Sequence, residues 1–388
     1  IQHHEFPYTT VAGLTYDTGN YEAATARALE LFGMDELRAE QKARRESGDP
    51  VQLGIGISTF TEMCGLAPSR TLGALKYAAG GWEHCTIRVL PTGKVELVTG
   101  TSPHGQGHAT AWSQIASSIL GVPVEDIEVI HGDTDNTPFG LGTYGSRSTP
   151  VSGAAAALVA RKVRDRARIV AAAALECAPD DLEWELGRWY VRGDRERGKT
   201  VQEIALLSHG SLELPEGVEG HLEAMTVYNP PNLTYPYGCY ICVVDVDPGT
   251  GQVKIRDFVA VDDCGTRINP MIVEGQIHGG LTQGFGTAMM ELISFDEDGN
   301  CFGGNFMDYL IPTAVESPTW VLGETTTPSP HMPIGAKGVG ESPTVGSPQA
   351  FVNAVVDALS PYGVRNIDMP LSAHKVWKLL RENGVSDE

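Results

Sequence analysis

Three strand pairs joined by tight turns constrain the fold of this chain most strongly. They cover residues 86–99, 182–191 and 237–261, and each contains two short stretches of strand-forming residues around a glycine-bearing turn. In the longest pair the turn is formed by residues 248–251, Pro-Gly-Thr-Gly. Because such turns join antiparallel neighbours, we expect mixed sheets.

Helical patterns alternate loosely with these strand pairs. The sequence contains no internal repeat of fixed period. Residues 22–46 predict two charged amphipathic helices, and residues 151–177 predict one long helix. A later helix is predicted at residues 349–359, with Ser347-Pro348 as its N-cap and first position. The 388 residues therefore predict an α/β protein with mixed (α+β) sheets.

Charge and cysteine content narrow the class of protein. The net charge of −21 argues against a nucleic-acid partner, whose phosphates favour lysine and arginine. It still allows an anionic cofactor, because backbone N–H groups bind phosphate locally. Seven scattered cysteines are typical of reduced thiols in a cytoplasmic protein. Cys239 and Cys242 lie in an apolar strand without a second pair nearby, so we expect buried thiols and no zinc site.

The ends and the apolar stretches give two further expectations. The chain begins at Ile1 without a signal-peptide pattern, which suggests a part of a longer polypeptide. Its longest apolar stretch, residues 154–175, is interrupted by charged side chains and is not expected to cross a bilayer.

The glycine-rich stretch at residues 335–342 is the strongest candidate for a functional loop. It reads Gly-Ala-Lys-Gly-Val-Gly-Glu-Ser, so three glycines surround one carboxylate, Glu341, with Lys337 four residues before it. Glycine permits close approaches that a Cβ forbids. Glu341 is therefore expected in a tight loop just before a helix, with an ordinary solvated loop as the alternative.

Two more polar loops suit an anionic or elongated ligand. Residues 101–108 lead into a predicted helix, whose first N–H groups favour an anion. His104 and His108 have metal-ligand spacing, but without a carboxylate in the pattern we expect structural or supporting roles. The loop at 132–149 is long and rich in hydrogen-bond donors.

A G-x-G-x-x-G pattern at Gly140, Gly142 and Gly145 suggests a nicotinamide site. We reject it because about eight residues separate the first glycine from the preceding strand. The pattern also requires a second strand ending in an acidic residue, whereas a long helix is predicted there.

Four polar loops, at residues 104–108, 143–149, 262–276 and 335–342, together resemble the cofactor-binding segments of the molybdenum hydroxylase family, which includes xanthine dehydrogenase and aldehyde oxidase. The G-Q-G motif of that family matches residues 105–107. Its V-G-E loop matches residues 339–341, and its G-Q after an N-P matches Gly275-Gln276 after Asn269-Pro270.

Longer runs look most like the large subunits of the carbon monoxide-oxidising (carbon monoxide dehydrogenase) members of the family. These runs are residues 131–149, 230–236, 261–270 and 335–342. The resemblance covers nearly all of the chain and implies the C-terminal portion of such a subunit.

The resemblance also implies a division into three parts. Residues 1–80 would be a helical and extended segment that continues an upstream cofactor domain. Residues 81–230 and 231–388 would be two molybdopterin-binding α/β subdomains, the second of which carries the Glu341 loop.

Residue roles follow from the resemblance. Glu341 would be the catalytic carboxylate beside molybdenum, and Gln106 and Gln276 would hydrogen-bond the pterin and the oxo ligands. Residues 146–149 would hold the nucleotide end. The complete set of implied cofactor-binding residues is Gly105, Gln106, Gly107, His108, Thr143, Tyr144, Gly145, Ser146, Arg147, Ser148, Thr149, Asp263, Cys264, Asn269, Gln276, Lys337, Gly338, Val339 and Gly340.

The implied cofactor is molybdenum on molybdopterin cytosine dinucleotide, with Cu(I) held by a cysteine in an upstream A-Y-R-C-S-F-R loop. This chain contains no such loop, so we assign none of its residues to a metal. The implied partners are the N-terminal part of the same subunit, an FAD-binding medium subunit and a small subunit with [2Fe–2S] clusters, in a dimer of heterotrimers. The expected location is the cytoplasm, with peripheral attachment to the inner membrane face through partners as an option.

The expected reaction is oxidation of carbon monoxide with water to carbon dioxide. The nearest alternative is a copper-free hydroxylase of an aldehyde or N-heterocycle on the same scaffold. A non-catalytic homologue is a further alternative, which the presence of Glu341, Gln106 and Gln276 disfavours.

Overall fold

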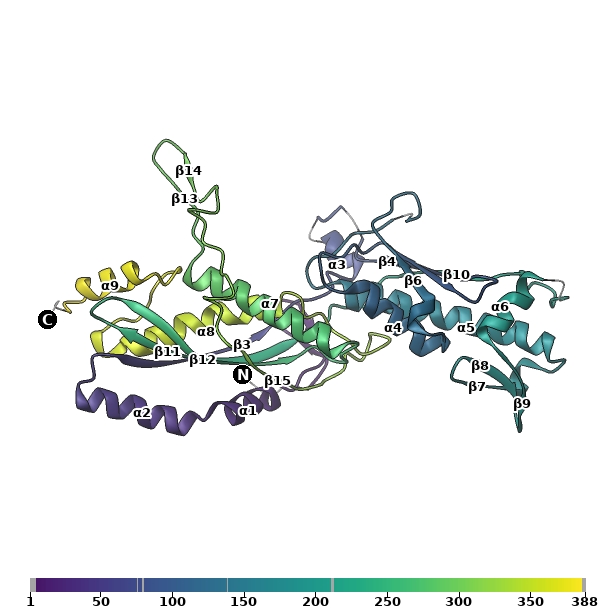
Figure 1. Ribbon diagram of the computed structural model, residues 1–388, viewed down its shortest axis with the longest axis horizontal. Helices are drawn as coiled ribbons and strands as arrows, with labels where there is room; N and C mark the ends of the chain where they lie inside the picture. The colour runs from purple at the N-terminus through teal and green to yellow at the C-terminus, as the bar shows by residue number, and fades with distance from the viewer. Residues whose placement is uncertain (1–4, 75, 79, 138, 211–212, 386–388) are drawn as a thin grey trace.

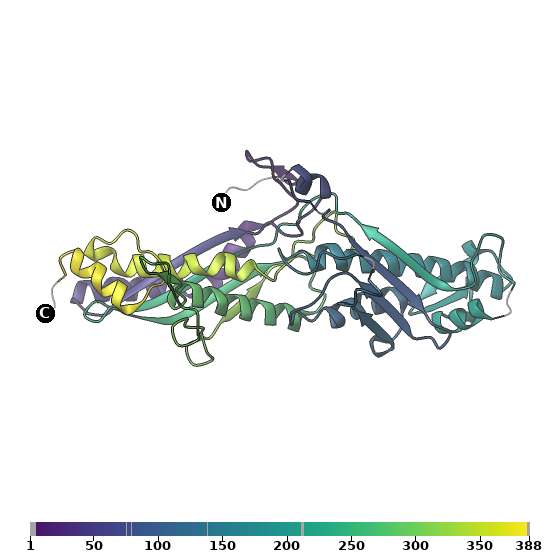
Figure 2. The ribbon, with the colours of Figure 1, turned by 90° about the horizontal axis from the view of Figure 1, so that it is seen from above.

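The computed structural model describes residues 5–74, 76–78, 80–137, 139–210 and 213–385. It is elongated and consists of two lobes, each built on a four-stranded mixed sheet (Figures 1 and 2). The mixed sheets confirm the predicted fold class. The division into residues 1–80, 81–230 and 231–388 remains a prediction. Residues 1–4 of the first part and 386–388 of the last lie outside the described residues.

The first lobe contains the sheet β10-β4-β5-β6. Strand β4 pairs antiparallel with both β10 and β5, whereas β5 and β6 run parallel. The four strands are β4 (Glu83–Val89), β5 (Val95–Thr99), β6 (Ile127–Ile130) and β10 (Leu222–Tyr228). The chain leaves β5 through residues 100–107 before it enters a helix, so this polar loop starts at the carboxyl end of a strand, where ligands of α/β proteins commonly bind.

Helices α4 (His108–Leu120) and α5 (Ala154–Ala174) pack on each other and on this sheet. The buried face of α5 is mostly alanine, which allows close packing, and it joins one large apolar core. Helix α6 (Val201–His209) packs against α5. A three-stranded antiparallel sheet completes the lobe with β7 (Leu182–Glu185), β8 (Arg188–Val191) and β9 (Asp194–Thr200).

The second lobe contains the sheet β15-β12-β11-β3. Strand β11 pairs antiparallel with β12 and β3, and β15 pairs parallel with β12. The four strands are β3 (Gln52–Thr61), β11 (Tyr237–Asp247), β12 (Gln252–Asp263) and β15 (Val321–Glu324). Cys239 and Cys242 are free and buried on β11, which confirms the prediction of buried thiols.

Helices cover both faces of this sheet. Alternate residues of β11 enter two separate cores, one shared with α7 (Pro270–Met289) and α8 (Ser342–Leu359), the other with α1 (Tyr21–Phe32). The remaining elements are α2 (Met34–Ser47), which contacts β3, and α9 (Ala373–Glu382), which contacts β12. The short ones are α3 (Ser69–Ala74), β1 (Tyr8–Thr9) and β2 (Thr15–Tyr16).

A hairpin of β13 (Ser294–Phe295) and β14 (Cys301–Phe302) projects away from the second lobe (Figure 1). Its base continues into residues 303–316, where Phe306 and Met307 are more than four-fifths exposed. In the described residues, no helix is long and apolar enough to cross a membrane.

The start of α8 differs from the prediction. The helix begins at Ser342 with Glu341 as its N-cap, and Pro343 occupies its first turn. Pro348 lies inside the helix, so the predicted N-cap at Ser347 is wrong. Ser347 instead donates its hydroxyl to the carbonyl oxygen of Pro343 at 2.7 Å and packs against Gly284 of α7. Tertiary packing between α7 and α8 therefore overrides the local signal.

Two glycines on β3 determine how closely α8 approaches the sheet. A Cβ added at Gly54 would lie 2.0 Å from the carbonyl oxygen of Ala354, and one at Gly56 would lie 2.1 Å from that of Ala350. Because both obstacles are helix backbone, a larger residue must push α8, and with it Glu341, away from β3.

We expect the Gly56→Ala variant of the full-length protein to lose about 1–3 kcal/mol of unfolding free energy, because it overpacks this contact. Gly279→Ala is the matched control, since a Cβ at this helical position meets no atom within 4 Å. The control should be neutral or slightly stabilising. Equal thermal unfolding midpoints for the two variants would contradict this account of the packing.

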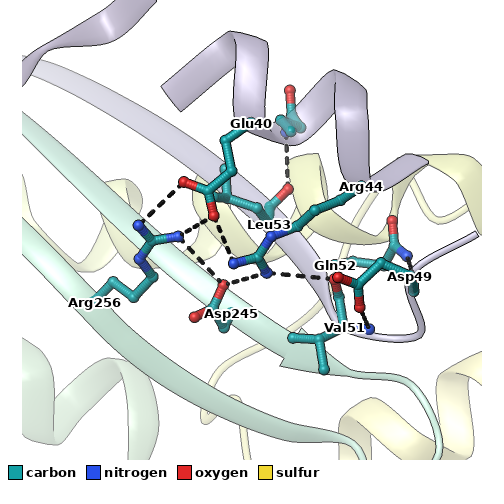
Figure 3. A network of polar contacts seen from close by, with 9 residues as sticks. Glu40, Arg44, Asp49, Val51, Gln52, Leu53, Asp245 and Arg256 are labelled. Carbon is teal, nitrogen blue, oxygen red and sulfur yellow. Dashed lines mark hydrogen bonds and ion pairs between the residues drawn. The ribbon is translucent and has the colours of Figure 1, made fainter. Parts of the chain in front are cut away.

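Helix α2 is fastened to the sheet by an ion-pair network (Figure 3). The Glu40 carboxylate accepts hydrogen bonds from Arg256 at 2.8 Å and from Arg44 at 2.6 Å. Arg44 also reaches Asp245 on β11 at 2.9 Å. These hydrogen bonds, that of Arg256 foremost, lower the pKa of the Glu40 carboxyl below 4.5.

This network predicts a pH-dependent stability difference for Glu40→Gln. A depressed pKa in the folded state stabilises the protein above the unfolded-state pKa, and this contribution is lost as pH falls through the folded-state value. Wild type should therefore exceed the variant in stability at neutral pH, and the gap should close below about pH 4.5. In the control, Glu46→Gln, which breaks the exposed Lys42 pair, the gap should stay small at every pH.

Candidate functional site

Four loops of the two lobes meet around a cavity of about 370 Å³. They come from the start of α4, from residues 143–149, from the start of α7 and from residues 337–341. The predicted site residues that line it are Gln106, His108, Thr143, Tyr144, Ser146, Ser148, Thr149, Cys264, Asn269, Gln276, Lys337, Gly338, Val339, Gly340 and Glu341.

Three helices begin at this cavity. His108 is the first residue of α4, while Asn269 and Glu341 are the N-caps of α7 and α8. Each helix N-terminus carries a partial positive charge. Their convergence favours a ligand that bears phosphate or other negative charge, even though the chain as a whole is acidic.

A backbone hydrogen bond fixes the position of Glu341, and its side chain does not cap α8. Its N–H donates to Ser146 Oγ at 3.0 Å, and its exposed carboxylate makes no capping bond to α8. The carboxylate is therefore available to a group bound in the cavity.

Lys337 does not pair with Glu341. Its ammonium group donates to the carbonyl oxygens of Thr18 at 3.2 Å and Tyr235 at 3.1 Å, and it lies over the ring of Tyr237. Burial lowers the pKa of Lys337 below its usual value. The lysine therefore fastens the loop to the second lobe.

Glycine is required where the loop passes the neighbouring chain. A Cβ at Gly338 would lie 2.3 Å from the carbonyl oxygen of Ser146 and 2.8 Å from Cys64 Sγ. The Lys337 N–H donates to the carbonyl oxygen of Cys264 at 2.7 Å, which joins this loop to the end of β12. These contacts join the 337–341 loop to the 143–149 loop and to Cys264 at one wall of the cavity.

Two buried donor or acceptor atoms at the cavity have no partner among the described residues. They are Nδ1 of His108 and Nε1 of Trp112, whose rings stack at 4.9 Å. Burial, helped by the charges of His131 and His104, lowers the pKa of His108 to about 4, so its imidazole is neutral near pH 7. Unpaired buried polar atoms are costly, and these two belong to residues that line the cavity.

The three predicted amides are used differently. Gln106 accepts a hydrogen bond from the backbone of His104, and Gln276 approaches Gly340. Asn269 is already engaged, because it caps α7 through Ile272 and donates to Gln114. In the described residues, no group of three or more His, Cys, Asp or Glu could hold a metal ion.

Arg147 does not reach the cavity wall. It is fully buried with Glu83, its guanidinium 3.0 Å from the carboxylate, and it donates to the carbonyl oxygens of Gly142 at 2.8 Å and Trp82 at 3.1 Å. Arg147 therefore anchors the 143–149 loop to β4, and it is not among the residues that line the cavity.

Asp263 is likewise occupied within the protein. Its carboxylate accepts from Tyr237 at 2.8 Å and from the Thr327 hydroxyl and N–H at 2.8 and 3.0 Å. The structure does not place it on the cavity wall. Three predicted glycines are also absent from the wall, and each has a positive φ that shapes a turn: Gly105, Gly107 and Gly145.

Sequence patterns missed several residues at the site. One is Glu62, a buried carboxylate behind the cavity, which belongs to no motif and is notable only as a lone acid at the end of an apolar strand. Residues that line the cavity without having been predicted are His104, Ala111, Trp112, Thr266, Ile268, Ile272, Val273 and Gln283.

Family comparison identifies the class of protein that this fold and site define. Residues 27–318 match the molybdopterin cofactor-binding domain, and the chain belongs to this family. The match ends before the Glu341 loop.

Individual relatives are similar to the chain in sequence and in structure. The chain is 50% identical over 387 residues to the carbon monoxide dehydrogenase large chain of Hydrogenophaga pseudoflava, covering 100% of this chain and 48% of that one. A crystal structure of Cu,Mo-CO dehydrogenase superposes with a TM-score of 0.93 at 48% identity, over 98% of this chain and 48% of the other. Quinoline 2-oxidoreductase from Pseudomonas putida 86 gives 0.90 at 36% identity, over 97% and 48%. The chain thus spans about half the length of these relatives.

Proposed function

We propose that this chain is the C-terminal half of the molybdenum-binding subunit of an aerobic carbon monoxide dehydrogenase. The observation that carries the proposal is the convergence of four loops and three helix N-termini on one cavity, in a chain half identical to a carbon monoxide dehydrogenase large chain. The reaction is CO + H2O → CO2 + 2 H⁺ + 2 e⁻.

The residues of the cavity fit a pterin dinucleotide. Unpaired His108 Nδ1, the glycine-lined loop at 338–340 and the hydroxyl and amide groups on the wall suit a polar, anionic molecule. In the proposed complex, Gln106 and Gln276 bind the pterin end, while Ser148 and its neighbouring hydroxyls bind the nucleotide, in its cytosine form. When bound, the molybdenum cofactor supplies the two-electron oxidation and copper, held by a cysteine outside this chain, supplies a site for carbon monoxide.

Glu341 is proposed as the general base. Its exposed carboxylate lines the cavity and has no cationic partner in the described part of the chain, so it can take a proton from water positioned there. The remaining polar groups hold the ligand and leave this one carboxylate free.

The proposal extends to the assembly. The N-terminal part of the same subunit completes the cavity, an FAD-binding medium subunit and a small subunit with [2Fe–2S] clusters carry the electrons away, and two heterotrimers form a dimer. The proposed location is the cytoplasm or, through these partners, the inner face of the membrane.

Metal analysis of the intact complex tests the proposal. Near-equal molybdenum and copper per copy of this chain, with copper and carbon monoxide oxidation lost together on chelation, is the expected result. Molybdenum without copper, in a preparation that hydroxylates an aldehyde or N-heterocycle, would favour the alternative that the likeness to quinoline 2-oxidoreductase suggests. A folded, assembled complex with neither metal would refute both.

A further inference from the structure

Glu62 lies directly behind the candidate active site. It follows β3, is 7% exposed, and its two carboxylate oxygens face different loops of the cavity wall. Ser146 donates its hydroxyl to Oε1 at 2.6 Å, and Ser342 donates to Oε2. Ser146 belongs to the 143–149 loop, and Ser342 is the residue after Glu341. One buried carboxylate therefore joins these two segments.

The hydroxyl of Ser146 has one proton and two carboxylates within reach. Its Oγ lies 2.6 Å from Glu62 but 3.5 Å from Glu341 Oε2. A hydroxyl donates one hydrogen bond at a time, and the shorter one is the stronger. The Ser146 hydroxyl therefore donates its hydrogen bond to Glu62, and its oxygen accepts the N–H of Glu341 at 3.0 Å.

The position of Ser146 is fixed by its surroundings. Its φ of 48° lies in the left-handed region, which a serine adopts at some cost. The backbone of Gly338 packs against it so closely that a Cβ there would lie 2.6 Å from Ser146 Cβ. This packing and the bonds of its Oγ to Glu62 and to the Glu341 N–H hold the Ser146 hydroxyl between the two carboxylates.

Several other titratable groups face Glu62. Burial raises the pKa of Glu62, while the bonds from Ser146, Ser342 and Cys64 oppose this and the charge of Glu341 adds to it. From the sheet beneath, Asp262 and Tyr240 also interact with Glu62; burial raises the pKa of Asp262 to about 7.

We propose that Glu62 is a positioning residue for Glu341. It binds the Ser146 proton and thereby keeps the Glu341 carboxylate free of an internal donor, while its bond to Ser342 fixes the start of α8. The proposal rests on the proposed function only for the role of Glu341 as base; the hydrogen-bond arrangement is independent of it.

Glu62→Gln reverses the direction of the hydrogen bond between residue 62 and Ser146 Oγ. Its amide oxygen can still accept from Ser342, but its NH2 must donate to Ser146 Oγ, which turns the serine proton toward Glu341. A donor to the carboxylate and the loss of a neighbouring negative charge both favour ionised Glu341 and weaken it as a base.

In the assembled holoenzyme, Glu62→Gln should keep wild-type molybdenum content and KM while kcat falls about 3- to 10-fold. The acidic limb of the pH profile of kcat/KM should move to lower pH. In the Ser146→Gly background, Glu62→Gln should shift the acidic limb less, because the serine proton is absent. Glycine at 146 also adopts the left-handed φ without strain. Glu40→Gln, on α2, is the control and should leave the profile unchanged.

A crystal structure of the Glu62→Gln complex gives a readout that does not depend on turnover. The distance from Ser146 Oγ to Glu341 Oε2 should close from 3.5 Å to about 2.7 Å. An unchanged distance, or a fall in kcat with an unshifted limb, would overturn the proposal. If Glu62→Gln does not assemble, Ser146→Gly decides: a limb moved to higher pH by that change alone would mean that Ser146 donates to Glu341, and would also overturn the proposal. A complex without molybdenum would refute the proposed function but leave the distance test intact.

Discussion

In the Glu341→Gln variant, kcat for carbon monoxide oxidation is expected to fall about 10²- to 10⁴-fold, the usual contribution of a general base. The amide has the shape of the carboxylate but cannot accept a proton at neutral pH. The loop should keep its conformation, because Glu341 is held by its backbone N–H on Ser146 and Lys337 by its N–H on Cys264.

Molybdenum and pterin content should therefore match wild type in this variant, measured by elemental analysis and by the pterin nucleotide released on denaturation. Val345→Ala is a matched control one turn further along α8, since Val345 is partly exposed and absent from the cavity wall. If Glu341→Gln retained more than a tenth of the wild-type kcat, Glu341 would not be the base. If it lost the cofactor as well, its role would be binding.

The second large effect is expected at the buried ion pair. Arg147→Met removes the partner of Glu83, and both side chains have no solvent exposure. A buried charge left without its partner typically costs about 3–5 kcal/mol. The 143–149 loop should also loosen, because Arg147 holds it through Gly142.

Hydrogen exchange and thermal unfolding of the full-length protein measure this effect. Amide protection should fall most in residues 139–149, and cofactor content should fall with it, since Thr143 and Tyr144 line the cavity. Arg27→Met is the control, because Arg27 pairs with Glu30 at the surface and should lose less than about 1 kcal/mol. The double variant with Glu83→Gln should recover part of the loss; equal costs for the buried and the surface arginine would contradict the argument.

The elements that local sequence determines were predictable. The hairpin of β11 and β12 follows from two apolar runs around a glycine turn, and α1 and α2 follow from their periodicity. Strand β15 was not predictable, because it is short and pairs with β12 across the long excursion through α7 and the β13–β14 hairpin. Such non-local pairing leaves no periodic signal in four residues.

The candidate site shows the same division. The glycine-rich loops predicted most of the cavity wall, because close backbone approach requires glycine at positions such as Gly338. Arg147 and Asp263 were assigned to the cofactor by motif, but both lie off the cavity wall, Arg147 bonded to Glu83 and Asp263 to Thr327. Glu62 was missed because nothing in its sequence neighbourhood shows that two serines, 84 and 280 residues away, would meet it.

The buried pair of Glu83 and Arg147 also constrains how this protein can evolve. Either residue replaced alone leaves an unpaired charge in the interior, so most single changes at these positions pass through an unstable intermediate. A lineage can abandon the pair only by changing both positions together, or by first acquiring stability elsewhere. Across relatives, positions 83 and 147 should therefore vary jointly or not at all, whereas the surface pair at 27 and 30 should vary freely.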